Sequence, residues 1–586
     1  MSLLALAGCR EPVDTHVPEQ GPPPVSGGGL EIVAGGAYAI ASDPARASIH
    51  IVNLEQGSDR RIQLTAADEP GRIVEGPDGV VHVVLRSAGE VLSIDPATGT
   101  QIRRREACEG PRGIDVDPDT GDLLVACTEG IVVRMPGGEG GVMSRFPLAP
   151  DLRDIVVYSG GRMLVSRFRS AEVLMVEDER IVHTEVLPRF DDALGRSLAS
   201  TVAWRMRETA GGDVMVMHQH SVTSQLGSLG STTGGVYYGG DCDVGVVRPA
   251  VSRVSPRWGD APNATVGGVA VQQLSLGVDV DVDGDEMVVA GAAEPGESTL
   301  NGGPGFAGSR AIPMGDLAAT PVCSGPGGFF GDPDGLQDSD RPATSIAALP
   351  DGGYAVLYRD PVELALVVDG SRRTITLDGG EVTDVGHALF HESAGTGSTC
   401  AGCHPEGGED GHTWAFETGA RRSQTLLGGI LGTAPFHWDG QVTDTTEVMD
   451  GTFVGRMGGS MPLPFEVQSF AEWMDELPAL PGAYVADTDA VERGRALFER
   501  SDVGCTSCHS GDMRTNNQTV DVGTADDHRN GATRFQVPAL YEVAYRPTYM
   551  HDGRASTLDE VLTTHAGGVQ LDEAQRGDVA AYLRSL

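Results

Sequence analysis

The sequence predicts a multidomain protein with an all-β N-terminal part, a seven-bladed propeller, and a mainly α C-terminal third. Three observations support this fold class: strand–turn–strand units repeat over residues 31–375, helical apolar periods begin near residue 380, and the C-terminal third contains one pattern twice. The 586 residues are too many for one hydrophobic core. We therefore expect an N-terminal segment (1–30), the propeller (31–375) and two tandem helical domains (380–484 and 487–586).

Turn residues between short apolar strands define the repeating units of the propeller. The clearest turns lie at residues 76–79, 117–122, 159–161, 282–285 and 349–353. Turn residues between β-branched runs are hairpin signals, and the first three units recur about every 40 residues, the period of a four-stranded blade. Weaker units bring the count to seven blades. The alternative is a pair of β-sandwiches or another β-rich arrangement, and a propeller alone indicates no function.

The charge and the N-terminus indicate the setting of the protein. The net charge is −41, and such an acidic surface repels phosphate backbones, which argues against nucleic-acid binding. Residues 6–9 (Leu-Ala-Gly-Cys) resemble a bacterial lipobox, in which the Cys is lipidated. We expect a lipid on Cys9, followed by a Pro- and Gly-rich tether over residues 11–29. The protein would then be exported by a Gram-negative bacterium, facing the periplasm or on the outer membrane, and attached to the membrane only by its lipid.

Four further cysteines lie outside the C-terminal motifs: Cys108, Cys127, Cys242 and Cys323. An even number in an exported chain favours disulfides. The preferred pairing is Cys108–Cys127 and Cys242–Cys323, because the first pair flanks one short hairpin-like unit. The alternative is four buried free thiols.

The C-terminal third contains two aligned copies of one pattern. Residues 386–390 match 494–498, 400–404 match 505–509, 438–440 match 551–553, and 470–477 match 579–586. The last pair carries apolar residues at helical spacing, and Asp572 with Gln575 predicts a capping box at the start of the final helix. Because the order is the same in both copies, we interpret this region as a duplicated domain.

Each copy contains Cys-x-x-Cys-His, the attachment signature of haem c. The two thiols add to the haem vinyl groups, and the next residue brings an imidazole under the iron as proximal ligand. Zinc, the main rival, would need more convergent Cys or His at each site. We therefore expect two covalently bound haem c groups, with thioethers from Cys400, Cys403, Cys505 and Cys508 and proximal ligands His404 and His509.

Residues 380–586 resemble the di-haem cytochrome c peroxidase superfamily, which includes the methylamine dehydrogenase maturation enzyme. The resemblance is most specific in residues 493–498, 505–509, 521–524, 534–540 and 549–561. It implies tandem cytochrome c domains with an aromatic residue between the haems as an electron bridge, and Trp438 stands at that position. The alternative role of Trp438 is core packing. A calcium ion between the haem domains is a further candidate cofactor.

The same resemblance indicates candidates for the distal iron ligands. His565 stands where relatives carry a Met or Tyr ligand to the second haem; the alternative is a surface or propionate-bonding His. The first haem has three alternatives: His412, in a segment similar to the family's distal-His segment, Met457, at the place of the family's acidic catalytic residue, or no protein ligand. Because Met457 replaces that acid, peroxidase activity is in doubt while electron transfer is not.

These patterns predict a di-haem c-type cytochrome, a peroxidase-like oxidoreductase or electron-transfer protein that serves a redox partner protein. Three alternatives stay open: a hydrogen-peroxide reductase, a haem-dependent oxidase acting on a partner protein, and a binding protein whose propeller captures a partner while the haems connect it to an electron-transfer chain. A six-coordinate spectrum in both oxidation states would favour electron transfer, and a high-spin haem would favour the enzymes.

Overall fold

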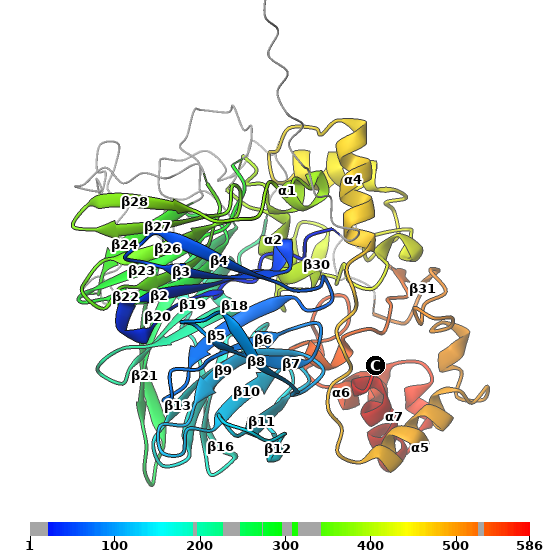
Figure 1. The fold of residues 1–586 in the computed structure, drawn as a ribbon. Coiled ribbons are helices and arrows are strands. Elements are labelled where there is room, and N and C mark those ends of the chain that lie inside the picture. Colours follow the sequence, from blue (N-terminus) through cyan, green and yellow to red (C-terminus); the bar gives the residue numbers. More distant parts are fainter. Residues whose placement is uncertain are drawn as a thin grey trace, which may run out of the picture.

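Seven antiparallel sheets form a β-propeller in the part of the chain that the structure describes (Figure 1). The computed structural model describes residues 21–191, 196–226, 246–271, 274–295, 308–314, 341–395, 397–524 and 532–586. Blades 1 to 4 comprise β1 (Leu30–Val33), β2 (Tyr38–Asp43), β3 (Ser48–Asn53) and β4 (Ser58–Gln63); β5 (Pro70–Glu75), β6 (Val81–Leu85), β7 (Glu90–Asp95) and β8 (Thr100–Glu106); β9 (Pro111–Val116), β10 (Leu123–Cys127), β11 (Ile131–Met135) and β12 (Ser144–Pro147); β13 (Leu152–Tyr158), β14 (Arg162–Arg167), β15 (Glu172–Glu177) and β16 (Arg180–Val186).

Blades 5 to 7 complete the ring. They comprise β17 (Phe190–Asp191), β18 (Ser197–Glu208), β19 (Val214–Val222), β20 (Val247–Arg257) and β21 (Asn263–Ala270); β22 (Gly277–Asp283), β23 (Glu286–Gly291) and β24 (Gly308–Pro313); β25 (Ala343–Ala348), β26 (Tyr354–Tyr358), β27 (Glu363–Val368) and β28 (Ser371–Thr376). The inner strand β25 of the last blade contacts β1 of the first, so the ring is closed. The predicted seven-bladed propeller is confirmed, and the β-sandwich alternative is excluded.

Buried carboxylates on the inner strands join successive blades. Asp154 on β13 accepts a hydrogen bond from the backbone N–H of Met206 in the next blade at 2.7 Å. Asp279 on β22 accepts one from the N–H of Ile346 at 3.0 Å. Both aspartates are almost completely buried. Because a buried N–H without a partner is costly, these side chains stabilise one spacing between neighbouring inner strands.

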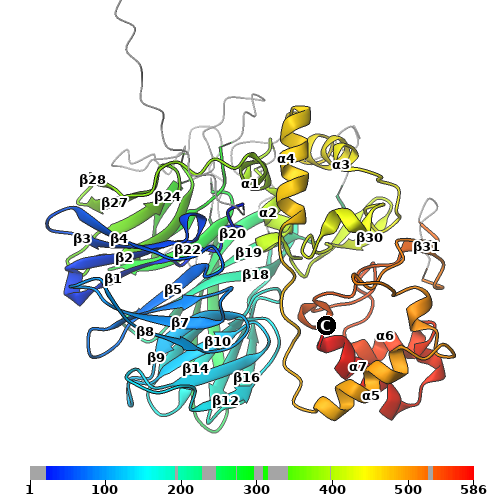
Figure 2. The same ribbon diagram turned by 45° about the vertical axis from the view of Figure 1, so that its right-hand side comes forward.

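The C-terminal third is mainly helical and consists of two units in tandem, the first within residues 380–484 and the second within 487–586. The first contains α1 (Val385–His391), α2 (Cys400–Cys403), β29 (Thr413–Phe416), β30 (Gly419–Arg422), α3 (Thr445–Val448) and α4 (Pro464–Asp475); the second contains α5 (Thr488–Phe498), β31 (Thr519–Val520), β32 (Phe535–Gln536), α6 (Leu558–Thr564) and α7 (Glu573–Arg584). Figure 2 shows α1, α2 and α4 beside the propeller and α5, α6 and α7 gathered in a separate cluster.

The duplicated sequence produces duplicated helix packing. α1 contacts α4 in the first unit, and α5 contacts α7 in the second. At both contacts a glycine leaves no room for a side chain: a Cβ on Gly386 would lie 2.5 Å from the carbonyl oxygen of Ser469, and one on Gly494 would lie 1.9 Å from that of Asp578. This close approach explains why both copies have Gly at the same position. The predicted capping box of α7 is also present, with Asp572 and Gln575 bonded reciprocally.

Residues 21–29 are packed between the propeller and the first unit. The backbone carbonyl of Pro22 accepts a hydrogen bond from Trp473 Nε1 at 2.9 Å, and the N–H of Val25 donates to His391 Nε2 at 3.2 Å. Arg153 on β13 donates to the carbonyl of Ser26 at 2.8 Å. The sequence predicts a tether over residues 11–29, so its last part differs from that expectation. The reason is that side chains far along the chain satisfy the backbone of this Pro- and Gly-rich segment.

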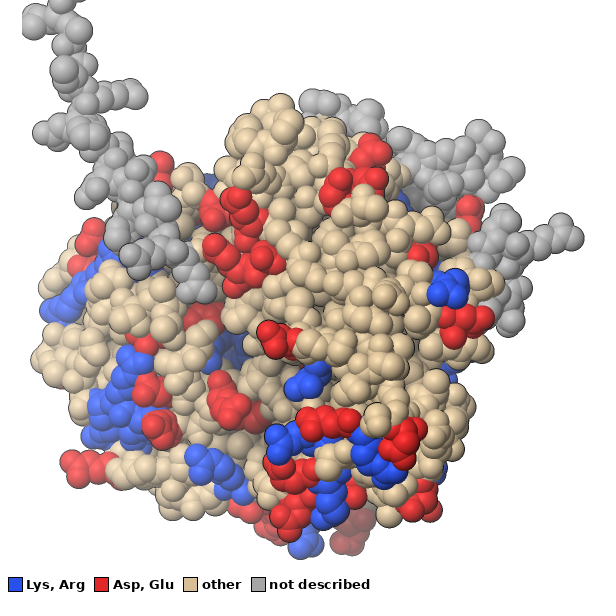
Figure 3. Space-filling view, turned by 90° about the vertical axis from the view of Figure 1, so that its right-hand side faces the viewer, with Lys and Arg blue, Asp and Glu red and all other residues tan. Residues whose placement is uncertain are grey.

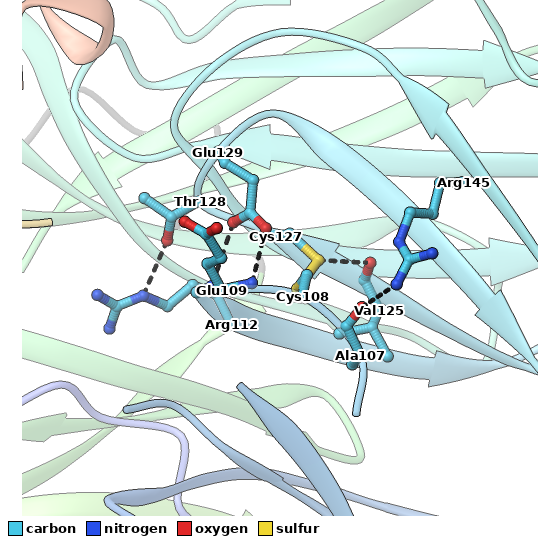
Figure 4. Close-up of a disulfide and its surroundings, with 10 residues drawn as sticks. Ala107, Cys108, Glu109, Arg112, Val125, Cys127, Thr128, Glu129 and Arg145 are labelled. Atoms are coloured by element: carbon cyan, nitrogen blue, oxygen red, sulfur yellow. Dashed lines mark hydrogen bonds between the residues drawn. A yellow bond between two sulfur atoms is a disulfide. The ribbon is translucent and has the colours of Figure 1, made fainter. Parts of the chain in front are cut away.

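The Cys108–Cys127 disulfide is present in blade 3, as predicted (Figure 4). Beside it, the carboxylate of Glu129 accepts hydrogen bonds from the N–H groups of Glu109 and Gly110, which fixes the strand connection. Cys9 and the predicted Cys242–Cys323 pair lie outside the described residues. Among the residues that are described, no helix is both long and apolar enough to cross a membrane.

Removing this disulfide should destabilise the propeller without removing haem. The bridge closes a sequence separation of 19 residues, and a loop of this size contributes about 3 kcal/mol through the unfolded chain. We expect Cys108→Ala/Cys127→Ala to lower the free energy of unfolding in denaturant by that amount. Mild reduction of the wild type is the control and should have the same effect. A variant as stable as the oxidised wild type would contradict the prediction.

Candidate functional site

The first Cys-x-x-Cys-His motif lies on α2, directly against the propeller. Thr399 caps this helix by accepting the N–H of Gly402 at 2.9 Å. Gln219 on β19 donates to the carbonyl of Gly402 at 2.9 Å. Cys400 and Cys403 form no disulfide, and burial raises the pKa of the Cys400 thiol to about 12. Both thiols therefore remain available for thioether bonds.

The histidine of each motif is held through one ring nitrogen. His404 Nδ1 donates to the carbonyl of Gly408 at 3.3 Å, and His509 Nδ1 donates to that of Arg514 at 3.1 Å. Burial lowers the pKa of both imidazoles to about 4. A neutral imidazole with Nδ1 bound to a carbonyl presents Nε2 to a metal in a fixed orientation.

Apolar side chains surround both motifs. The first lies in a cluster that includes Leu389, Phe390, Leu427, Met449, Phe453, Phe470 and Leu477, and the second in one that includes Phe498, Val503, Val543, Leu558, Leu562 and Val579. Free thiols, an oriented neutral imidazole and apolar walls fit a covalently bound haem in each unit. Such a haem supplies one-electron redox chemistry, whereas the protein sets its ligands and surroundings.

His565 faces the proximal histidine of the second unit. The ring centroids of His565 and His509 lie 6.3 Å apart. His565 follows the C-terminal end of α6, and its Nδ1 donates to the carbonyl of Ala566 at 2.8 Å, so that Nε2 is left for a ligand. The helix therefore places the predicted distal imidazole opposite the predicted proximal one.

The two predicted distal residues of the first unit lie in different surroundings. His412 is buried, its Nε2 lies 3.1 Å from the carbonyl oxygen of Val222 in the propeller, and its ring packs edge-on against Trp414. Met457 packs at the margin of the apolar cluster around the first motif. His412 thus uses its Nε2 for a hydrogen bond, whereas the side chain of Met457 packs against apolar residues.

His437 is a histidine of the first unit that the sequence reasoning does not single out. It has a left-handed backbone with a φ of 63°, which is uncommon outside glycine and often marks a functional position. Burial lowers the pKa of His437, as it lowers that of His404. The sequence repeat offered a signal, because Met550 occupies the position in the second unit that matches His437. The backbone of Met550 is also left-handed, with a φ of 67°.

The two units share a local framework that diverges after one turn of helix. Asp444 and Thr557 cap matching helices, and each accepts the N–H of a glutamate three residues later. The second unit continues as α6 to His565. The first unit instead forms a π-helix, η6 (Met449–Val454). Counted from the two capping residues, Thr452 occupies the position in the first unit that matches His565 in the second. Its hydroxyl oxygen is buried without a hydrogen-bond partner among the described residues.

Trp438 lies at the boundary between the two units. Its side chain is 7% exposed, and its Nε1 donates to the carbonyl of Arg422 at 2.8 Å. Its ring centroid lies 6.4 Å from that of His551, the matching residue of the second copy. His551 in turn stacks on Phe535 at 3.7 Å. The boundary therefore contains a continuous group of aromatic rings.

A guanidinium group fills the boundary where calcium is expected. Arg422 donates to the carbonyls of Thr548 and Met550 at 2.9 and 3.0 Å and pairs with Glu409 at 2.7 Å. Arg546 binds the other carboxylate oxygen of Glu409 at 2.8 Å. Calcium requires several such oxygen ligands. Because these oxygens already bind arginines, the residues here do not fit a calcium ion.

Comparisons with known proteins agree with this arrangement. The cytochrome c family model matches residues 491–586, so the second unit is a cytochrome c domain. Three curated relatives are similar to this chain: hydrazine synthase subunit gamma of Kuenenia stuttgartiensis (24% identical, 35% of this chain and 78% of the relative), cytochrome c551 peroxidase of Nitrosomonas europaea (24%, 36% and 82%) and the methylamine utilization protein MauG of Methylorubrum extorquens (27%, 35% and 78%).

Proposed function

We propose that this protein is a di-haem c-type cytochrome that passes electrons between a redox partner protein and two haems joined through Trp438. The observation that carries the proposal is the pair of matched Cys-x-x-Cys-His units whose boundary contains Trp438 opposite His551. The similarity to haem c oxidoreductases supports the same class of chemistry.

The proposal assigns different tasks to the two haems. The first motif is covered by the propeller through Gln219, whereas Ser507 within the second motif is exposed. Figure 3 shows the face over the helical units, where charges of both signs alternate over the second unit. One such pair, Arg493–Asp578, joins α5 to α7. We assign the exchange of electrons with the partner protein to the second haem, because its surroundings are the more accessible.

Axial ligation completes the proposal. We assign His509 and His565 to the second iron, because their rings face each other at 6.3 Å. We assign His404 and His437 to the first, since His437 directly precedes Trp438 at the boundary, has a left-handed backbone, and has no protein hydrogen bond on either ring nitrogen among the described residues. Both irons would then be six-coordinate, as suits electron transfer.

A second candidate function is hydrogen-peroxide reduction at the first haem. One observation favours it: the helix that carries His565 in the second unit is replaced by η6 in the first, and Thr452 stands in the matching place. If His437 does not bind iron, that side of the haem is open to a small ligand. The two functions therefore differ in the coordination of the first iron.

The proposed location is outside the cytoplasm, with a lipid on Cys9. The Cys108–Cys127 disulfide supports an oxidising compartment. The alternative in which the propeller axis captures a partner receives no support at the end that faces the first unit, because residues 21–29 pack there.

Two haems should be attached covalently. The mass of the denatured mature protein should exceed that of the polypeptide by two haem groups, because each motif has two free thiols. Cys505→Ala/Cys508→Ala is the matched control and should lose one of them. Zinc, or a single haem in the wild type, would refute the proposal.

The distal ligands should be separable by electron paramagnetic resonance. We expect two low-spin signals in the oxidised wild type, and His565→Ala and His437→Ala should each convert a different one to high spin by removing an axial imidazole. His412→Ala and Met457→Leu are the controls and should leave both signals in place. A high-spin haem in the wild type that responds to peroxide would instead select the second candidate function.

Replacement of Trp438 should slow electron transfer between the haems. We expect Trp438→Ala to keep both haems and to reduce the inter-haem rate at least about tenfold, about 1.4 kcal/mol in barrier height, as measured by rapid-mixing reduction. Trp473→Ala is the control, because it removes another buried indole of the first unit. If Trp438 only packs the core, both variants lose roughly 3–5 kcal/mol of stability with equal transfer rates in the folded protein.

A further inference from the structure

The loop after the first haem motif inserts an anion into the propeller. Glu406 follows His404 by two residues and has a left-handed backbone with a φ of 53°. Its carboxylate contacts three arginines, Arg153 at 2.8 Å, Arg112 at 3.1 Å and Arg86 at 3.4 Å. These arginines come from β13, from β9 and from the residue after β6, so three consecutive blades converge on one carboxylate.

The whole group is removed from solvent. The side chains of Arg153, Arg86 and Arg112 are 3%, 5% and 13% exposed, and that of Glu406 is 13% exposed. Burial alone would raise the pKa of Glu406, but the three arginines outweigh it and hold the pKa well below its usual range. Charges in such surroundings interact strongly because water screens them little.

Other residues fix the arginines in place. Arg112 Nε donates to the hydroxyl of Thr128 at 3.0 Å (Figure 4), which leaves its terminal nitrogens for Glu406. Arg153 donates to the carbonyl and the hydroxyl of Ser26 at 2.8 and 2.9 Å. The arginines therefore have protein partners and are not a vacant site for an external anion.

A second attachment holds the same loop. Arg169, between β14 and β15, donates to the carbonyl of Glu409 at 3.1 Å and pairs with Asp151. Gly408 lies between the two attachments, and a Cβ there would lie 2.6 Å from the guanidinium of Arg169. The carbonyl of Gly408 is the group that accepts the hydrogen bond from His404 Nδ1. The propeller thus holds the acceptor that orients the proximal imidazole.

We propose that the propeller regulates the first haem, with Glu406 and its arginines setting the electrostatic potential on the proximal side of that haem. Arg86, Arg112 and Arg153 are positioning residues that act through Glu406 and the loop to Gly408. A positive charge beside the haem stabilises the ferrous over the ferric state, and a negative charge does the opposite, because reduction removes one positive charge. This inference rests on the proposed function, since it requires haem at Cys400–His404.

The test is a spectroelectrochemical titration of the full-length protein in three variants. Glu406→Gln removes a negative charge and should raise one of the two haem potentials. Arg112→Gln removes a positive charge and should lower that same potential. We expect each ferrous-to-ferric ratio at a fixed potential to change at least threefold, about 30 mV for one electron. Arg104→Gln, the same substitution on the outer strand β8 with 40% exposure, is the control and should move neither potential.

The outcomes separate this inference from the proposed function. Mass spectra come first, and a wild type without haem in the first unit refutes the proposed function. With two haems present, unchanged potentials or shifts in the same direction in both variants overturn the inference. If Glu406→Gln does not fold, Arg112→Gln and its combination with Glu406→Gln decide the question, because the double variant should return the potential toward that of the wild type.

Discussion

A buried anion, the carboxylate of Glu406, joins the propeller to the first haem unit, beside the apolar cluster that the two share. A buried charge is tolerated only when it is paired, and removal of one partner of a buried pair typically destabilises a protein by about 3–5 kcal/mol. Here one carboxylate pairs with arginines from three blades, so it joins these blades to the loop after the first haem motif. Charges of the propeller and of the first unit therefore compensate each other. Two domains joined only by a flexible linker would not need a buried charge of this kind between them.

This constraint makes the two haem environments unequal. The first motif has the propeller on one side and residues 21–29 close by, and hydrogen bonds hold both in place. The second unit also meets the propeller, since Arg169 lies over the ring of Tyr545 at 5.7 Å, and just before this unit the N–H of Tyr484 donates to the carbonyl of Glu129 at 2.8 Å. A cofactor in the first setting is controlled by protein charges, and one in the second is more open to a partner.

Much of this organisation could be predicted from local patterns. The turn spacing predicted the seven blades, the matched motifs predicted the two units, and Cys108 and Cys127 lie close enough in sequence for their pairing to be inferred. The Glu406 contacts could not be predicted, because Arg86 is 320 residues away and nothing in either local sequence indicates the other. The packing of residues 21–29 was missed for the same reason, since its partners, such as Trp473, are distant along the chain.

The difference between the haem units arises from a small change on a shared framework. In both, an aspartate or threonine caps a short helix after a β-bridge, Phe436 with Val442 in the first and Tyr549 with Ala555 in the second. In the first unit the N–H of Gly455 then donates to the carbonyl of Asp450, five residues back, and π-turns of this kind are common at functional sites. The wider turn places Thr452 at the position that matches His565. In the proposed arrangement, the second haem would take its distal ligand from His565 at the end of α6, whereas the first would take it from His437 or have an open position.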